Sequence, residues 1–234
     1  MSAKILCIET SALACSVAIG DDDALLASKM SDGAWKHSRE VTLLIAACLK
    51  EANLMMDEIS AVAISGGPGS YTGLRVGASA AKGICYTKSI PLIALETLKI
   101  IAFPHVKDLG AGSFIIPMID ARRDEVYYNI YDNELAGQIE TTNLIINESS
   151  LSNYHSKDCI ICGDGAEKAE KLLINDANND QMQSFSFRSN IALAENMVQL
   201  AYNSYKSGQF EDLAYYSPFY LKPPNITKSK KQLF

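Results

Sequence analysis

Histidine is scarce in this sequence of 234 residues. Three occur, His37, His105 and His155, and none has a second histidine four positions away. Two histidines one helical turn apart form the metal-binding face of a helix-borne zinc site, as in many metalloproteases. The sequence therefore excludes that kind of site, disfavours a metalloprotease and predicts no bound metal.

Long apolar runs are also missing. The apolar run near the start ends at Glu9 after four residues, and the longest uncharged stretch, residues 59–74, is broken by glycines and a proline. A helix that spans a bilayer needs about 20 apolar residues, and a signal peptide needs a longer apolar core than this one. We expect no membrane segment, no signal peptide and a cytoplasmic location.

An excess of positive charge is lacking as well. The chain has 21 lysine and arginine residues against 27 aspartate and glutamate residues, which gives a formal net charge of −6. Binding to a phosphate backbone requires a concentrated cationic field. We therefore do not expect this chain to bind nucleic acid unaided.

The six cysteines are scattered through apolar segments. A chain of this length can build a core without disulfides, so we expect reduced, buried thiols. Cys159 and Cys162 form a CxxC pattern on a predicted strand, where residues three apart point to opposite faces. Provided that the strand extends through Cys162, the pair can neither share a zinc ion nor close easily into a disulfide.

The order of the predicted elements is repeated along the chain. The first part predicts an antiparallel meander at 4–8, 15–19 and 24–29, then a helix at 41–52, a strand at 59–65, a helix at 74–85, a strand at 91–95 and a helix at 97–103. After a turn-rich segment at 104–112, the second part predicts strands at 114–119, 126–131, 139–146 and 159–162 and a helix at 166–173.

This repetition predicts an α/β protein with the actin/Hsp70-like ATPase (ASKHA) fold, made of two duplicated halves of βββαβα type. We place the N-terminal half at residues 1–105 and the C-terminal half at 106–234. A last helix, about 190–207, belongs to the second half but can pack back on the first. The tail that follows it, from residue 216 onward, is proline-punctuated and basic, and we expect a solvated, mobile end.

The most distinctive segment is a glycine loop between a predicted strand and a predicted helix. It consists of Gly66, Gly67, Gly69, Ser70, Tyr71, Thr72 and Gly73. It is not a phosphate-binding loop of the Walker A type, because no Gly-Lys-Ser/Thr follows. Its glycine spacing is close to a dinucleotide fingerprint, but a meander precedes it. Two interpretations remain: free N–H groups at the helix start bind an anion or an acidic group, or the glycines supply unusual φ angles in a tight turn.

A second candidate site is the pair of acidic residues that end the first strand of each half, Glu9 and Asp120. With Thr10 they could hold a metal-bound nucleotide between the halves, as carboxylates do in actin-like ATPases. Alternatively, each satisfies nearby backbone N–H groups. The turn after Glu9 lacks the glycine that lets a phosphate approach the backbone closely. We favour a degenerate site with weak or no nucleotide binding and predict no cofactor.

Four segments together resemble the bacterial TsaB (YeaZ) family of tRNA threonylcarbamoyladenosine biosynthesis proteins. They occur in the order of that family and span nearly the whole chain. One departure is Glu9, where the family usually has aspartate, which further weakens a nucleotide role. The segments are Ile5-Leu-Cys-Ile-Glu-Thr-Ser, Ser65-Gly-Gly-Pro-Gly-Ser-Tyr-Thr-Gly-Leu-Arg-Val-Gly, Pro117-Met-Ile-Asp-Ala-Arg-Arg-Asp-Glu-Val-Tyr and Pro218-Phe-Tyr-Leu-Lys.

The resemblance implies a non-catalytic scaffold subunit. In such systems the paralogous transferase TsaD moves threonylcarbamoyl from an adenylate to N6 of the adenosine beside the tRNA anticodon. TsaB is its obligate partner, joined through N-terminal helices, the ATPase TsaE binds the pair, and tRNA is reached only through the complex. The implied joining surface, which could also form a homodimer, comprises Val41, Leu44, Ile45, Cys48, Leu74, Arg75, Ala78 and Ala81.

Two alternatives stay open at this point. The apolar faces of these two helices could simply cover their own sheet. The chain could also be an enzyme of the same fold, a small-molecule kinase or ATPase that uses Glu9 and Asp120.

Overall fold

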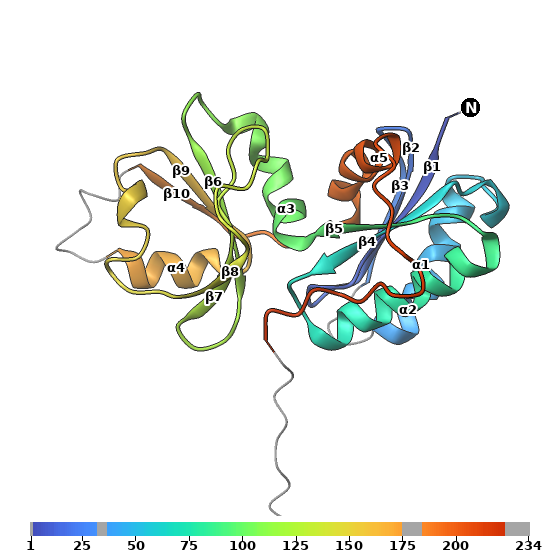
Figure 1. Cartoon of the computed structure of the whole chain (residues 1–234), viewed down its shortest axis with the longest axis horizontal. Coiled ribbons are helices and arrows are strands. Elements are labelled where there is room, and N and C mark those ends of the chain that lie inside the picture. Colours follow the sequence, from blue (N-terminus) through green and yellow to red (C-terminus); the bar gives the residue numbers. More distant parts are fainter. Residues whose placement is uncertain (1, 32–36, 175–183, 223–234) are drawn as a thin grey trace, which may run out of the picture.

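The computed structural model describes residues 2–31, 37–174 and 184–222, and it contains two five-stranded sheets (Figure 1). The first sheet has the strand order β3-β2-β1-β4-β5. Strands β1, β2 and β3 are antiparallel, whereas β4 and β5 run parallel to β1. The strands are β1 (Lys4–Glu9), β2 (Ser16–Asp21), β3 (Ala24–Met30), β4 (Ala61–Gly67) and β5 (Leu92–Glu96).

The second sheet repeats this arrangement. Its order is β10-β9-β6-β7-β8, with an antiparallel meander from β6 to β8 and two strands parallel to β6. Strand for strand, β6 to β10 take the places of β1 to β5, which confirms the predicted duplication and α/β fold class. The strands are β6 (Phe114–Asp120), β7 (Glu125–Tyr128), β8 (Thr142–Ile145), β9 (Cys159–Cys162) and β10 (Phe185–Arg188).

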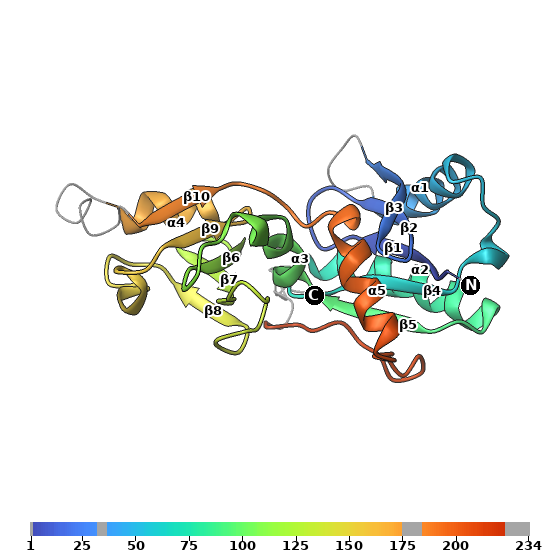
Figure 2. The ribbon, with the colours of Figure 1, turned by 90° about the horizontal axis from the view of Figure 1, so that it is seen from above.

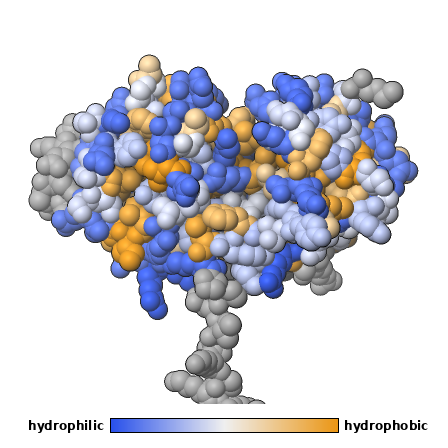
Figure 3. Space-filling view, in the orientation of Figure 1, coloured by the Kyte–Doolittle hydropathy of each residue, from blue (hydrophilic) through white to orange (hydrophobic). Residues whose placement is uncertain are grey.

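Helices α1 and α2 lie against each other and against the first sheet, and α4 lies against the second. Between β8 and β9, where α1 would have its counterpart, the described residues form a 3-10 turn, η3 (Ser152–Tyr154), in place of a long helix. The two halves form two lobes with a notch between them (Figure 3). The helices are α1 (His37–Glu51), α2 (Tyr71–Lys88), α3 (Thr97–Ala102), α4 (Ala166–Leu173) and α5 (Val198–Lys206).

The helix at the end of each half packs against the other half. Helix α3 follows the first sheet and contacts β6, whereas α5 follows the second sheet and contacts β1, β2 and β5. Figure 2 shows α5 lying over the strands of the first sheet. Alternate residues of β1 serve two cores: Ile5 packs with α3 and α5, and Leu6 packs with α1 and α2. The two halves therefore share a continuous hydrophobic core.

The predicted last helix is shorter than its periodicity indicated. A 3-10 turn, η5 (Ala194–Met197), precedes α5, and Ile191 lies before both. Gly208 has φ +66° and its N–H bonds to the carbonyl of Tyr205, as expected for a glycine just past a helix end. Strand β10 has no counterpart in the sequence-based prediction. None of the helices in the described ranges is long and apolar enough to cross a membrane.

Residues 211–222 form a strap, and the prediction of a mobile end from residue 216 is wrong for its described part (Figure 1, red). The Phe219 N–H donates to the Gly66 carbonyl at 2.7 Å. The Tyr220 ring lies 4.8 Å from the Tyr71 ring, centroid to centroid. Lys222 forms an ion pair with Glu125 of the second half. The strap therefore crosses the glycine loop and reaches both halves; Lys228, Lys230 and Lys231 lie outside the described residues.

Candidate functional site

The glycines of the loop bring α2 against the turn that follows β1. A Cβ atom placed on Gly69 would lie 2.6 Å from Ser11 Cβ. On Gly73 it would lie 1.9 Å from the Thr10 carbonyl oxygen, and on Gly77 it would lie 2.3 Å from Thr10 Oγ1. Real Cβ atoms do not approach other atoms this closely. Three glycines spaced four residues apart thus form a groove in which the first turn is seated.

The start of α2 is occupied by groups of the chain itself. The Ser70 N–H donates to the Ser11 carbonyl at 2.8 Å, and the Ser70 hydroxyl accepts from the Gly73 N–H at 3.3 Å. Tyr71, Thr72 and Gly73 belong to the first helical turn, not to the loop as predicted. Among the described loop glycines, Gly67 alone has a positive φ, +111°. Close packing, more than unusual φ angles, accounts for the glycine spacing.

Glu9 is fully buried at the end of β1. Its Oε1 accepts hydrogen bonds from the Ser11 N–H, the Ser11 hydroxyl and the Ala12 N–H. Its Oε2 is buried as well, and the Ser65 side chain is a further hydrogen-bonding neighbour of the carboxylate. Loss of solvation on burial raises the pKa of Glu9, and the hydrogen bonds from Ser11 oppose this shift. Glu9 therefore holds its own turn together, which is the second of the two roles considered for it.

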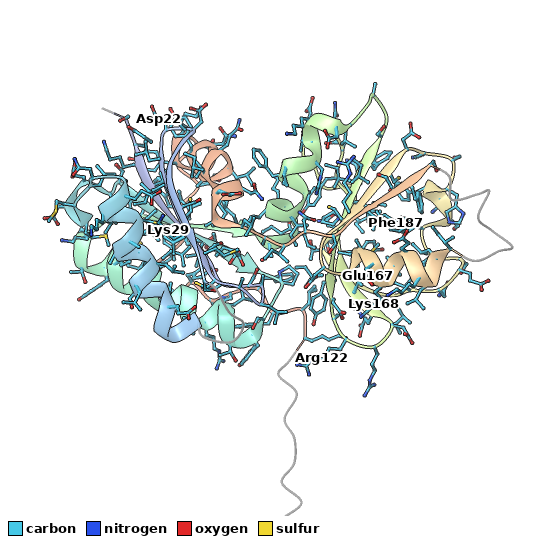
Figure 4. The ribbon with its side chains drawn as sticks, turned by 180° about the vertical axis from the view of Figure 1, so that it is seen from behind. Asp22, Lys29, Arg122, Glu167, Lys168 and Phe187 are labelled. Carbon is cyan, nitrogen blue, oxygen red and sulfur yellow. The ribbon has the colours of Figure 1, made fainter. Side chains whose placement is uncertain are left out.

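Asp120 has the corresponding place in the second half and is exposed. Its Oδ1 accepts from the Arg122 N–H at 2.6 Å and forms an ion pair with Lys168 of α4; both residues are labelled in Figure 4. The Asp120 N–H in turn donates to Asp164 Oδ1 at 3.0 Å. Burial raises the pKa of Asp164. These contacts tie the turn after β6 to α4.

The space between Glu9's turn and the second half is very small. A cavity of about 20 Å³ is lined by Ser11 and Ala12 of the first turn, by α3 and β6, and by Asp164. That volume holds about one water molecule, whereas small-molecule sites usually exceed about 300 Å³. Glu9, Thr10 and Asp120 are not among the residues that line this cavity.

The metal-ligating residue types do not gather in one place. No group of three histidine, cysteine, aspartate or glutamate side chains in the described ranges could hold a metal ion. Cys159 and Cys162 lie on β9 as predicted, with Cys159 in the core of the second sheet and Cys162 in the core shared with the first half. The six thiols are free and buried.

The proposed joining surface requires a correction. Most of its members are buried in the chain's own core between the first sheet and the two helices, so they cannot contact a partner without unfolding. The apolar faces of α1 and α2 cover the first sheet, which was the alternative interpretation of these residues. Only Arg75 is exposed, and Leu44 is half-buried. The buried members are Val41, Ile45, Cys48, Leu74, Ala78 and Ala81.

Helices α1 and α2 each also expose a large side chain to solvent. Tyr86 on α2 is 82% exposed and Leu43 on α1 is 65% exposed. On the same helix as Tyr86, Ser79 is exposed, and a Cβ atom on Gly83 would meet nothing within 4 Å. Small residues beside a large exposed aromatic side chain allow close approach of another helix.

Comparison with known proteins places the chain in a family. The family profile described as TsaD, tRNA N6-adenosine threonylcarbamoyltransferase, matches residues 31–228. The chain belongs to this family. The resemblance to its TsaB (YeaZ) members is also confirmed. The tRNA threonylcarbamoyladenosine biosynthesis protein TsaB of Bacillus subtilis (strain 168) is 28% identical over 156 residues, 66% of this chain and 67% of that protein.

Other members give the same result. TsaB of Escherichia coli (strain K12) is 31% identical over 134 residues, which is 57% of each chain, so the match spans little more than half of that relative. The crystal structure of a Pseudomonas aeruginosa protein with similarity to the peptidase YeaZ shares the fold at a TM-score of 0.80 and 24% identity. That match covers 94% of this chain and all of the other.

Proposed function

We propose that this chain is a non-catalytic subunit of the complex that adds threonylcarbamoyl to N6 of the adenosine beside the tRNA anticodon. Its partner would be the transferase TsaD. The observation that carries the non-catalytic part is this closed cleft: Glu9 Oε1 accepts hydrogen bonds from its own turn, and the cavity that the turn lines together with the second half holds about 20 Å³. Family membership and the TsaB relatives support the pathway.

We place the partner surface on the outer face of α1 and α2. Its centre is Tyr86, with Ser79 and Gly83 beside it on α2 and Leu43 on α1. This face replaces the mostly buried residues of the joining surface that the family resemblance implied. It is anchored rigidly, because the glycine groove fixes the start of α2 to the first turn. The same face could join two copies of this chain when TsaD is absent.

The remaining partners follow from the same proposal. The acidic net charge of −6 fits a subunit that binds a protein and leaves tRNA to the transferase. The ATPase TsaE would bind the assembled pair, and the complex would work in the cytoplasm, where tRNA is modified.

Co-expression with the TsaD paralogue tests the proposal. We expect a stable heterodimer on size exclusion, and modification of tRNA only when TsaD is present. Tyr86→Arg and Ser79→Arg should abolish co-elution and modification without changing the melting temperature of the isolated chain. Ile145→Arg, at an exposed position on the second half, is the matched control and should bind normally. Production of the modified nucleoside by the isolated chain would refute the non-catalytic role.

The kinase or ATPase alternative is tested by calorimetry with Mg-ATP. The closed cleft leads us to expect no heat of binding at millimolar ligand. Saturable binding that Glu9→Gln abolishes would favour the enzyme.

A further inference from the structure

Two connections described by the structure lead from one half to the other. The outgoing connection leaves α3 through a 3-10 turn, η2 (Phe103–Asp108), and enters β6. The returning connection, residues 189–193, runs from β10 to η5, which packs on the strands of the first half (Figure 2). Both pass beside the closed cleft, since Ile101 and Ala192 line its cavity. Side chains that join the two connections therefore hold the halves together at this cleft.

Asn190 of the returning connection makes two such contacts. Its Nδ2 donates to the Ile101 carbonyl at the end of α3 at 3.1 Å. Its Oδ1 accepts from the Gly163 N–H, which follows β9, at 2.7 Å. One amide side chain thus bonds to the last turn of the first half and to a loop of the second.

Arg188, at the end of β10, bonds to the outgoing connection. It forms an ion pair with Asp108, and its Nη1 lies 3.4 Å from Nδ1 of the half-buried His105. A guanidinium group can only donate hydrogen bonds, so Nδ1 of His105 is the acceptor and carries no proton. The contact therefore requires a neutral imidazole. We refer to His105, Asp108, Arg188 and Asn190 as the junction.

Protonation of His105 is incompatible with this contact. Nδ1 would then carry a hydrogen, and an imidazolium would face the guanidinium of Arg188. Burial lowers the pKa of His105, and the charges of Arg188 and Lys107 lower it further. The Asn190 side chain and the Asp108 charge oppose this shift without reversing it. The surroundings of the ring thus favour the neutral form that the geometry requires.

We propose that His105 is a pH-sensitive link between the two halves. In its neutral form it accepts from Arg188 and joins the outgoing and returning connections. Its protonation removes that hydrogen bond, separates Arg188 from the imidazolium and loosens the contact between the connections. This link is independent of the proposed partner function.

The pH range in which the link is lost follows from the direction of the pKa shift. The folded chain binds the His105 proton less tightly than the unfolded chain does. The contribution of the link to stability is therefore complete above the ordinary histidine pKa of about 6.5. It is lost as the pH falls through the lower pKa of the folded chain.

An NMR titration of the full chain measures the protonation of His105 directly, with its imidazole signal assigned by the loss of that signal in His105→Gln. We expect the signal to titrate below about pH 6.5. Hydrogen exchange at the Gly163 N–H and in residues 103–108 should become at least about tenfold faster on protonation, once the intrinsic pH dependence of exchange is subtracted. This is the loss expected for a hydrogen bond to a charged group.

His105→Gln separates the link from a general weakening in acid. Glutamine keeps an acceptor oxygen for Arg188 but does not titrate, so exchange at the junction should be as slow at about pH 5 as at neutral pH. His155→Gln is the matched control, because His155 contacts Ser150 and Phe185 of the second half and lies outside the junction. It should show the same acid-induced increase as the original chain.

Arg188→Gln tests the charge that faces the ring. Removal of the guanidinium should move the titration of His105 to a higher pH than in the original chain. A His105 signal that titrates at or above about pH 6.5 in the original chain would overturn the proposal and show that Asp108 stabilises the imidazolium. An acid-induced increase in exchange that is equal in His105→Gln would also overturn it, since another group would then be responsible.

Discussion

Gly73 of α2 lies directly against the carbonyl oxygen of Thr10, so closely that a Cβ atom on Gly73 would stand 1.9 Å from that oxygen. The opposing atom belongs to the backbone of a buried turn, which cannot move aside as a flexible side chain would. The position of α2, and with it the outer face proposed for the partner, depends on this contact.

We predict that Gly73→Ala destabilises the isolated chain by about 3 kcal/mol, because α2 must move away from the first turn. Gly83→Ala is the matched control on the same helix, where an added Cβ meets nothing. It should stabilise the chain by about 1 kcal/mol, since alanine loses less conformational freedom in a helix than glycine does. Urea unfolding measures the free energy of unfolding of both variants. Equal values for the two would contradict the conclusion that Gly73 is needed for close contact between α2 and the first turn.

The glycine string illustrates what sequence can and cannot predict. Its position between a strand and a helix is confirmed by β4 and α2. The reason for its glycines could not be derived, because the opposing residues, Thr10 and Ser11, are some 60 positions earlier in the chain. Local spacing reports backbone freedom at a position, not which distant segment approaches it.

We predict that Glu9→Gln stabilises the chain at neutral pH. Burial raises the pKa of Glu9, so the folded chain binds the Glu9 proton more tightly than the unfolded chain. Its contribution to stability is complete below the unfolded pKa and is lost as the pH rises through the folded pKa. Glutamine avoids this loss, so the advantage of the variant should grow as the pH rises from about 4, the ordinary range of a glutamate pKa, to neutrality.

Melting temperatures across this pH range, with the exposed Glu148→Gln as control, check the prediction. A variant less stable than the original chain at neutral pH would show that an ionised Glu9 is stabilised by Ser11 and Ala12.

We predict that the native chain is inert toward a thiol reagent such as DTNB near neutral pH. The six cysteines are buried, and burial raises the pKa of Cys48 and Cys85 to about 11 and that of Cys15 to about 12. Less than about 1% of such thiols is ionised at physiological pH. All six should react after denaturation in urea, and fewer than six would indicate a disulfide.

The elements that were predicted best are those whose packing is local. Helix α4 and strand β9 have the predicted bounds. In both, the order of apolar and polar residues along the segment indicates which side chains are buried. Strand β10 was missed because its alternation of Phe185 and Phe187 with polar residues covers only four positions, too few to stand out in the sequence; in the described structure its pairing with β9 defines it. The strap was missed because its contacts, such as Phe219 with Gly66, join residues far apart in the chain.

The larger cavity between the halves, which has a volume of about 840 Å³ and is lined by the end of β5, α3 and the strap, could not be predicted for the same reason. Glu96, Tyr131 and Glu211 are separated by long stretches of sequence, and no motif connects them. The prediction of the joining surface was wrong for a different reason. Helical periodicity selects the apolar stripe that a chain buries against itself, so it points away from a surface that a partner covers.

Helix α2 offers a direct test of this distinction in two residues, Ala81 and Ser79. Ala81 is fully buried against the first sheet, and an arginine there would bury an unpaired charge. We predict that Ala81→Arg destabilises the isolated chain by more than about 4 kcal/mol, whereas Ser79→Arg changes its stability by less than about 0.5 kcal/mol. In a co-expression assay both variants should lose the transferase, but only Ser79→Arg should do so while retaining the melting temperature of the original chain. If Ser79→Arg still bound TsaD, the outer face of α2 would not be the joining surface.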